Sequence, residues 1–402
     1  MRGLAGAAVL AAALLMGNTA AAQLAVSAND AKVKLVNGQV EVVKSPPADT
    51  VSFIDLRASP PKVVAELNVP ASVVGPPSSV AVSPKEDIVL VSGAMQIDPS
   101  DASKTIPDDK LTVIDITPLK QGLLKRLGLS KGAAPAPKII ATLQAGKGAA
   151  GVAINKAGTL ALVANRSEGT VSAFTISGTT VTAAGKVTVG GEKSGPSAVA
   201  FTPDGKSALV TLDADNKIVV LSIDGGKVEP TKRALSAGLR PYGLDIAAKG
   251  DVAVVANIGV GSGDADTISV IDLTLNPPRV VNTYTVGQTP EGIKMSPDGK
   301  YVAVSVMNGS NKPTDSPFLS TNGLLQVWTR NGTQLMKSGE LPIGRWCQGV
   351  AWSSNSKTLL VQCMVEEEIA VVRFTGSGRT PLQKVGTLKT KGGPAGIGTA
   401  QP

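Results

Sequence analysis

The sequence predicts an all-β fold, a seven-bladed β-propeller whose blades are four-stranded antiparallel sheets. Three observations support this prediction. A short pattern with a small residue before an apolar pair recurs seven times, the copies are mostly spaced in the forties, and the intervals contain short runs rich in Val, Ile and Thr. A repeat of this length with strand chemistry is typical of propellers, in which each blade is a four-stranded meander.

The small residue of the pattern locates the seven copies, which stand at Ser79, Gly151, Ala198, Gly243, Gly292, Gly349 and Gly396. The intervals between these positions are 72, 47, 45, 49, 57 and 47 residues. The innermost strands of a propeller converge on a central channel. We therefore expect close contact between neighbouring strands at this position, where a large side chain would collide.

The unit at 241–287 shows the four strands most clearly. Its apolar runs are "YGLDIA", "DVAVVAN", "TISVIDL" and "RVVNTYTVG", in that order. Each run is short, rich in β-branched residues and bounded by Gly, Pro, Asn or Asp, as strands in a meander are. The chain therefore supplies one complete blade per repeat.

The seventh copy ends at Pro402 after a single strand, and its missing strands are expected near the other end of the chain. Three runs match strands two, three and four: 38–43, 50–56 and 62–70. We expect the C-terminal strand to pair with these N-terminal strands, which closes the ring and removes a free sheet edge. The propeller is predicted over 35–402, after an N-terminal extension at 23–34.

Residues 1–22 have the pattern of a secretory signal peptide. One cation, Arg2, precedes an apolar run, and Ala20 to Ala22 form a small-residue cleavage site before Gln23. A membrane helix is the alternative, but the apolar run is short for that role. The pattern predicts an exported protein, periplasmic or secreted, in a bacterium.

Composition sets bounds on the mature chain. No later stretch approaches membrane-spanning length, so the sequence predicts no transmembrane segment. We also expect the protein to be a monomer. The formal net charge of +8 is mild for 402 residues and does not by itself indicate nucleic acid as a partner. Two cysteines cannot form a disulfide scaffold, so a large core must stabilise the fold.

The interval of 72 residues contains an insertion at 118–138. Its leucines approximate one helical stripe, and Lys120, Lys125 and Arg126 fall outside that stripe. This pattern predicts a short amphipathic helix. The helix would cover the outer edge of a blade, or dock a partner or an anionic polymer at a basic end of the ring. The insertion has no aromatic residues, which base stacking would favour.

Two long loops, 93–110 and 306–323, are expected at the opposite, acidic end. They contain Met95, Met307 and Phe318, and we expect them to wall a cleft over the channel mouth. The pairs Asp213-x-Asp215 and Asp264-x-Asp266 do not continue into full Ca²⁺ loops. We predict no metal and no cofactor.

Cys347 and Cys363 are placed to face each other across a hairpin. They lie on consecutive predicted strands, and the turn residue Asn355 is midway between them. In an exported protein this arrangement favours a disulfide. Two buried thiols are the alternative, since two ligands alone make a poor metal site.

The motif "SPDGKYVAV", followed in a neighbouring unit by "TISVIDL", resembles the YVTN-repeat β-propellers, which include lactonase-like and YncE-like exported proteins. The resemblance covers residues 35–402 and implies the propeller fold. It implies less about function, because propellers serve as hydrolases, redox subunits and binding modules. Lactonase-type members use His with Glu and Arg at the central mouth, and this chain contains no histidine.

Six residues are expected at the channel mouth by the register of the repeat, and they are Arg240, Tyr242, Glu291, Arg345, Trp346 and Gln348. An ordinary polar rim would have the same composition. The sequence favours a non-enzymatic binding or scaffold module that holds a protein or a small molecule at the mouth. The alternatives are a lactonase-like hydrolase using Glu291 and Arg240, and single-stranded nucleic-acid binding by the basic end.

Overall fold

The computed structural model describes residues 24–120, 136–376 and 378–400. The predicted signal peptide and most of the predicted helical insertion lie outside these residues. Within them, Thr117 to Lys120 form one helical turn. No helix of the described residues is long and apolar enough to cross a membrane.

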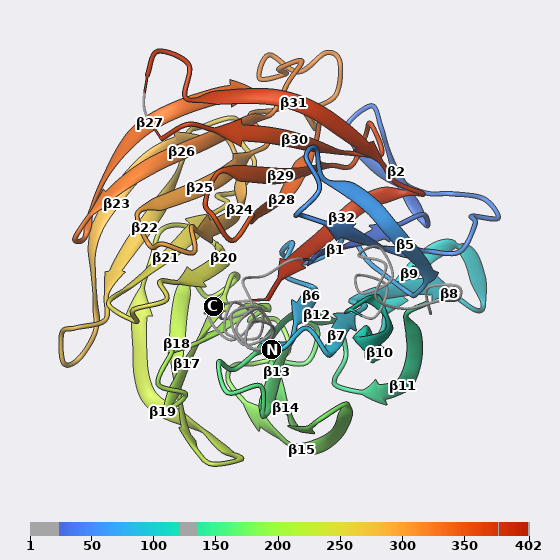
Figure 1. Ribbon diagram of the computed structural model, residues 1–402, viewed down its shortest axis with the longest axis vertical. Helices are drawn as coiled ribbons and strands as arrows, with labels where there is room; N and C mark the ends of the chain where they lie inside the picture. The colour runs from blue at the N-terminus through green and yellow to red at the C-terminus, as the bar shows by residue number, and fades with distance from the viewer. Residues whose placement is uncertain (1–23, 121–135, 377, 401–402) are drawn as a thin grey trace, which may run out of the picture.

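Seven four-stranded antiparallel sheets surround a central axis, which confirms the predicted fold (Figure 1). From the innermost strand outward, the first sheet consists of β6 (Val80–Val82), β7 (Ile88–Ser92), β10 (Lys110–Asp115) and β11 (Lys138–Gln144), and the second of β12 (Ala149–Ile154), β13 (Leu160–Asn165), β14 (Thr170–Ser177) and β15 (Thr180–Thr188). The third consists of β16 (Pro196–Phe201), β17 (Ser207–Leu212), β18 (Lys217–Asp224) and β19 (Lys227–Ser236). The next three are β20 (Pro241–Ile246), β21 (Val252–Asn257), β22 (Asp266–Asp272) and β23 (Arg279–Gly287); β24 (Pro290–Met295), β25 (Tyr301–Val306), β26 (Leu324–Asn331) and β27 (Gln334–Pro342); and β28 (Cys347–Trp352), β29 (Thr358–Cys363), β30 (Glu368–Phe374) and β31 (Leu382–Lys389).

The closing sheet combines both ends of the chain. Its order is β32 (Gly393–Thr399), β1 (Leu24–Asp30), β4 (Thr50–Asp55) and β5 (Lys62–Asn68), and β32 pairs antiparallel with β1. Strand β32 also contacts β6 and β28, so the seven innermost strands form a closed ring. The predicted closure by N-terminal strands is confirmed.

The identity of the second strand in this sheet differs from the prediction. That strand is β1 at 24–30, within the expected extension, and the run at 38–43 belongs instead to a separate hairpin of β2 (Val33–Val36) and β3 (Gln39–Val42). Every residue of β1 is buried, whereas β3 is mostly exposed. A strand covered on both faces shows no alternation of polar and apolar residues, so β1 has a weaker sequence signal than β3.

The small residues of the repeat lie where the inner strands approach one another. A Cβ atom added to Gly151, Gly243 or Gly292 would meet a backbone oxygen of the next inner strand at 2.4, 2.2 and 2.1 Å, respectively. These distances are far inside van der Waals contact, which confirms the reason predicted for the pattern. Apolar clusters fill the spaces between adjacent blades. In one of them, Ile293 on β24 and Val304 on β25 belong to the same buried cluster as β-branched residues of the preceding blade.

Two smaller hairpins stand outside the seven sheets. The long loop 93–110 folds into β8 (Met95–Asp98) paired with β9 (Asp101–Pro107). The β2–β3 hairpin is anchored at its tip, where Asn37 Oδ1 accepts hydrogen bonds from the backbone N of Thr314 at 2.8 Å and from its hydroxyl at 3.1 Å. The hairpin at 33–42 therefore reaches the second long loop.

Candidate functional site

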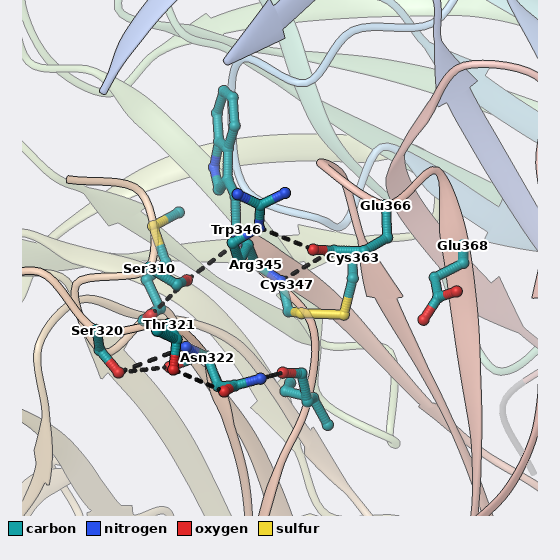
Figure 2. A network of polar contacts seen from close by, with 12 residues as sticks. Ser310, Ser320, Thr321, Asn322, Arg345, Trp346, Cys347, Cys363, Glu366 and Glu368 are labelled. Carbon is teal, nitrogen blue, oxygen red and sulfur yellow. Dashed lines mark hydrogen bonds and ion pairs between the residues drawn. A yellow bond between two sulfur atoms is a disulfide. The ribbon is translucent and has the colours of Figure 1, made fainter. Parts of the chain in front are cut away.

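A pocket of about 300 Å³ opens at the mouth of the central channel. Five of the six residues predicted at the mouth line it: Arg240, Tyr242, Glu291, Trp346 and Gln348. Arg345 is not among the lining residues, and its Nε donates to Glu366 Oε1 at 3.0 Å (Figure 2). The register of the repeat therefore locates most of the pocket, because the start of each inner strand faces the channel.

Three lining residues have a backbone conformation that usually requires glycine. In six blades the residue directly before the innermost strand has positive φ, and in three of them it is a glycine, at 148, 195 and 392. In the other three it is Arg240, Thr289 or Trp346, with φ of 55°, 54° and 46°. Such conformations cost roughly 1 kcal/mol for a residue with a side chain, and they cluster at functional sites. All three of these side chains line the pocket.

Glu291 is the buried acid of the pocket. It is the second residue of β24, and it is only 6% exposed. Burial raises the pKa of Glu291 to about 8, although Gln348, Arg166 and Arg240 act in the opposite direction. Among the described residues, Glu291 Oε2 has no hydrogen-bond partner. The carboxyl is therefore mostly protonated at pH 7 and becomes a proton acceptor as the pH rises through about 8, where it could serve as a general base.

An ion-pair cluster forms the cationic side of the pocket. Asp213 Oδ2 accepts from Arg166 at 2.7 Å and from Arg240 at 2.9 Å, and the Asp213 side chain is buried. Arg166 also donates to the Ser197 hydroxyl. Asp213, considered above as half of a Ca²⁺ pair, is therefore occupied in holding two guanidinium groups, which together carry one more positive charge than Asp213 neutralises.

Arg166 also lines the pocket, although it is not one of the six residues predicted at the mouth. It follows β13, the second strand of its blade, and the register of the first strands does not reach it. Its guanidinium carbon lies 5.3 Å from the centroid of the Tyr242 ring. Burial raises the pKa of Tyr242, so its phenol stays protonated at neutral pH and available as a hydrogen-bond donor.

The prediction that two long loops wall the mouth is correct for one of them. The loop at 306–323 contributes Met307, Asn311 and Lys312 to the lining, whereas no lining residue comes from 93–110. Further parts of the wall come from Val40 on β3, from the segment 73–75 and from the segment 258–261. The N-terminal hairpin thus takes the place expected of the first loop.

The predicted disulfide is present beside the pocket. Cys347 and Cys363 are directly opposed on β28 and β29, with Cα atoms 3.9 Å apart, and the sulfur atoms are bonded. The backbone N of Trp346 donates to Ser310 Oγ at 3.0 Å. Figure 2 shows the Trp346 side chain extending away from the disulfide. The disulfide and this hydrogen bond together hold the segment that carries Trp346.

Comparisons with known proteins agree with the fold. The model of the family "Lactonase, 7-bladed beta-propeller" matches residues 131–241. No curated protein matches the chain in sequence. A solved structure described as a putative 6-phosphogluconolactonase from Bacteroides uniformis aligns with a TM-score of 0.69 and 17% identity, covering 94% of this chain and 100% of that one.

Two further structures have the same architecture. The periplasmic gluconolactonase of Pseudomonas aeruginosa aligns with a TM-score of 0.66 and 16% identity, over 95% of this chain and 100% of that one. A protein of unknown function from Desulfotomaculum acetoxidans aligns with a TM-score of 0.66 and 14% identity, over 94% and 99%. At these identities the likeness concerns the fold alone, and the lactonase family model matches only residues 131–241 of this chain.

Proposed function

We propose that the protein is a lactonase-like hydrolase whose active site is the mouth pocket. The observation that carries the proposal is the buried carboxyl of Glu291, with its pKa raised to about 8, in a pocket that also contains Arg166 and Arg240. The match to the lactonase family model and the gluconolactonase names of structural neighbours support it. This proposal replaces the non-enzymatic module favoured by the sequence.

The chemistry follows from the groups present. The ionised carboxylate of Glu291 takes a proton from water, and the water oxygen attacks the lactone carbonyl carbon. A guanidinium group of Arg240 or Arg166 stabilises the negative charge that develops on the carbonyl oxygen. The ring C–O bond then breaks, and the leaving alkoxide receives the proton from Glu291, which leaves a hydroxy acid and the ionised carboxylate. This route needs no histidine.

The test is the rate of lactone hydrolysis, measured with a pH-stat that records the acid released. We expect the wild type to open δ-valerolactone or δ-gluconolactone, with kcat/KM rising as pH increases through about 8 and levelling off above it, because the base must lose its proton. The isosteric variant Glu291→Gln should lose at least about 100-fold in kcat/KM. The exposed Glu229→Gln variant serves as a matched control and should retain full activity. Full activity in Glu291→Gln would show that Glu291 is not the base, and inactivity of the wild type on every lactone would refute the function.

We also propose that this activity takes place in the periplasm. The signal-peptide pattern of residues 1–22 and the disulfide between Cys347 and Cys363 support an oxidising, exported location. Cell fractionation of the native host protein tests this location. Recovery of the full-length chain with residues 1–22 intact, in the cytosol, would refute it.

A further inference from the structure

Exposed apolar side chains gather at the rim of the mouth pocket. Val40, Val74 and Val260 line it, and they are 52%, 40% and 64% exposed. These valines come from three separate segments of the chain: strand β3, the loop before β6 and the loop after β21. Isolated exposed apolar residues are ordinary, but convergence of three on one pocket marks a binding surface.

The segments that carry this rim are tied in place. The backbone N of Gly259 donates to Leu239 O at 3.1 Å, and Lys312 Nζ donates to Gly261 O. These two contacts fix the loop of Val260 on both sides. Since the β2–β3 hairpin that carries Val40 is anchored on Thr314, the rim is a formed surface rather than a set of free loop tips.

The floor of the same pocket is polar and incompletely satisfied. Among the described residues, neither Glu291 Oε2 nor Gln348 Oε1 has a hydrogen-bond partner, although these two side chains belong to residues only 6% and 3% exposed. A buried polar atom without a partner is destabilising, and a ligand group that pairs with it gains the corresponding free energy. The pocket therefore combines a polar floor with an apolar rim.

We propose that the pocket selects a lactone that carries an aliphatic substituent. The lactone ring lies on the floor beside Glu291 and the two arginines, and the aliphatic chain lies over Val74 and Val260. A sugar lactone would instead bring hydroxyl groups against these valines, where desolvation of the hydroxyl groups is unfavourable. This inference rests on the proposed lactonase function and names the substrate class of the same site.

The experiment is a homologous series of δ-lactones with increasing side chains: δ-valerolactone, δ-octalactone, δ-decalactone and δ-dodecalactone. For the wild type we expect kcat/KM to rise about two- to fourfold per added methylene until the rim is covered, since a fully buried methylene corresponds to about a fourfold gain. In Val260→Ser the ratio of the decalactone value to the valerolactone value should fall. Met336→Ser is the control, because Met336 is 70% exposed on β27 and is not a lining residue.

Calorimetric binding of the same lactones to Glu291→Gln separates this inference from the proposed function. Affinity that rises with chain length, without hydrolysis by the wild type, would support the selection of aliphatic ligands and refute the hydrolase. Hydrolysis by the wild type with no dependence on chain length, or with δ-gluconolactone as the best substrate, would support the hydrolase and overturn the selection. An equal loss of the decalactone to valerolactone ratio in Val260→Ser and Met336→Ser would also overturn it.

Discussion

Substitution of Glu291 by Gln should stabilise the folded protein in a pH-dependent manner. Burial raises the pKa of this carboxyl from 4.5 to about 8 in the folded state. The folded state therefore holds a proton that the unfolded state releases between these two values. Stability falls as pH rises through this window, by about 1.4 kcal/mol per pH unit, and the loss stops growing once both states are ionised above pH 8.

The magnitude follows from the width of this window. Below about pH 4 the wild type and Glu291→Gln should have similar stability, because the carboxyl is largely protonated in both states, and at pH 5 the variant should be more stable by about 1 kcal/mol. At pH 7 the variant should be more stable by about 3 kcal/mol, and above pH 9 by about 5 kcal/mol, since an uncharged amide of the same shape has no ionisation to oppose. These differences are a large part of the total stability of a domain.

The assay is urea denaturation of the mature protein at five pH values from 5 to 9, for the wild type, Glu291→Gln and the exposed control Glu229→Gln. We expect only the difference between the wild type and Glu291→Gln to grow with pH. A difference that stays constant with pH, or a variant less stable than the wild type at pH 7, would refute the reasoning. Either result would mean that Glu291 is ionised and held by the charges of Arg166 and Arg240.

Two further perturbations test the architecture around the site. Replacing both Cys347 and Cys363 by Ser should lower the free energy of unfolding by about 3 kcal/mol, because the disulfide closes a loop of 16 residues; an unchanged denaturation midpoint would contradict this. Gly292→Ala should destabilise by about 1 to 3 kcal/mol, since its Cβ would lie 2.1 Å from Gln348 O. Gly226→Ala, with its nearest neighbour at 3.6 Å, is the control, and equal thermal melting of the two variants would rule out the close approach.

The pocket was only partly predictable from the sequence. Five residues stand at the starts of inner strands, so the spacing of the repeat predicts that they share the channel mouth: Tyr242, Glu291 and Gln348 are second residues of their strands, and Arg240 and Trp346 directly precede theirs. Arg345 lies two residues before β28, one residue further from its strand than Arg240 or Trp346, and Glu366 binds it outside the pocket lining. A shift of one residue at the start of a strand changes the direction of a side chain, and the repeat pattern does not resolve that shift.

The sequence by itself determined the number of blades, the close approach of the inner strands and the pairing of the cysteines. These features follow from local periodicity, because a strand, its turn and its neighbour are consecutive in the chain. Only the tertiary structure decided that β1, and not the run at 38–43, completes the closing sheet. It also decided that Arg166 and Val40 line one pocket and that Asp213 binds Arg166. The physical reason is that these contacts join distant segments, and burial in the assembled ring selects among them.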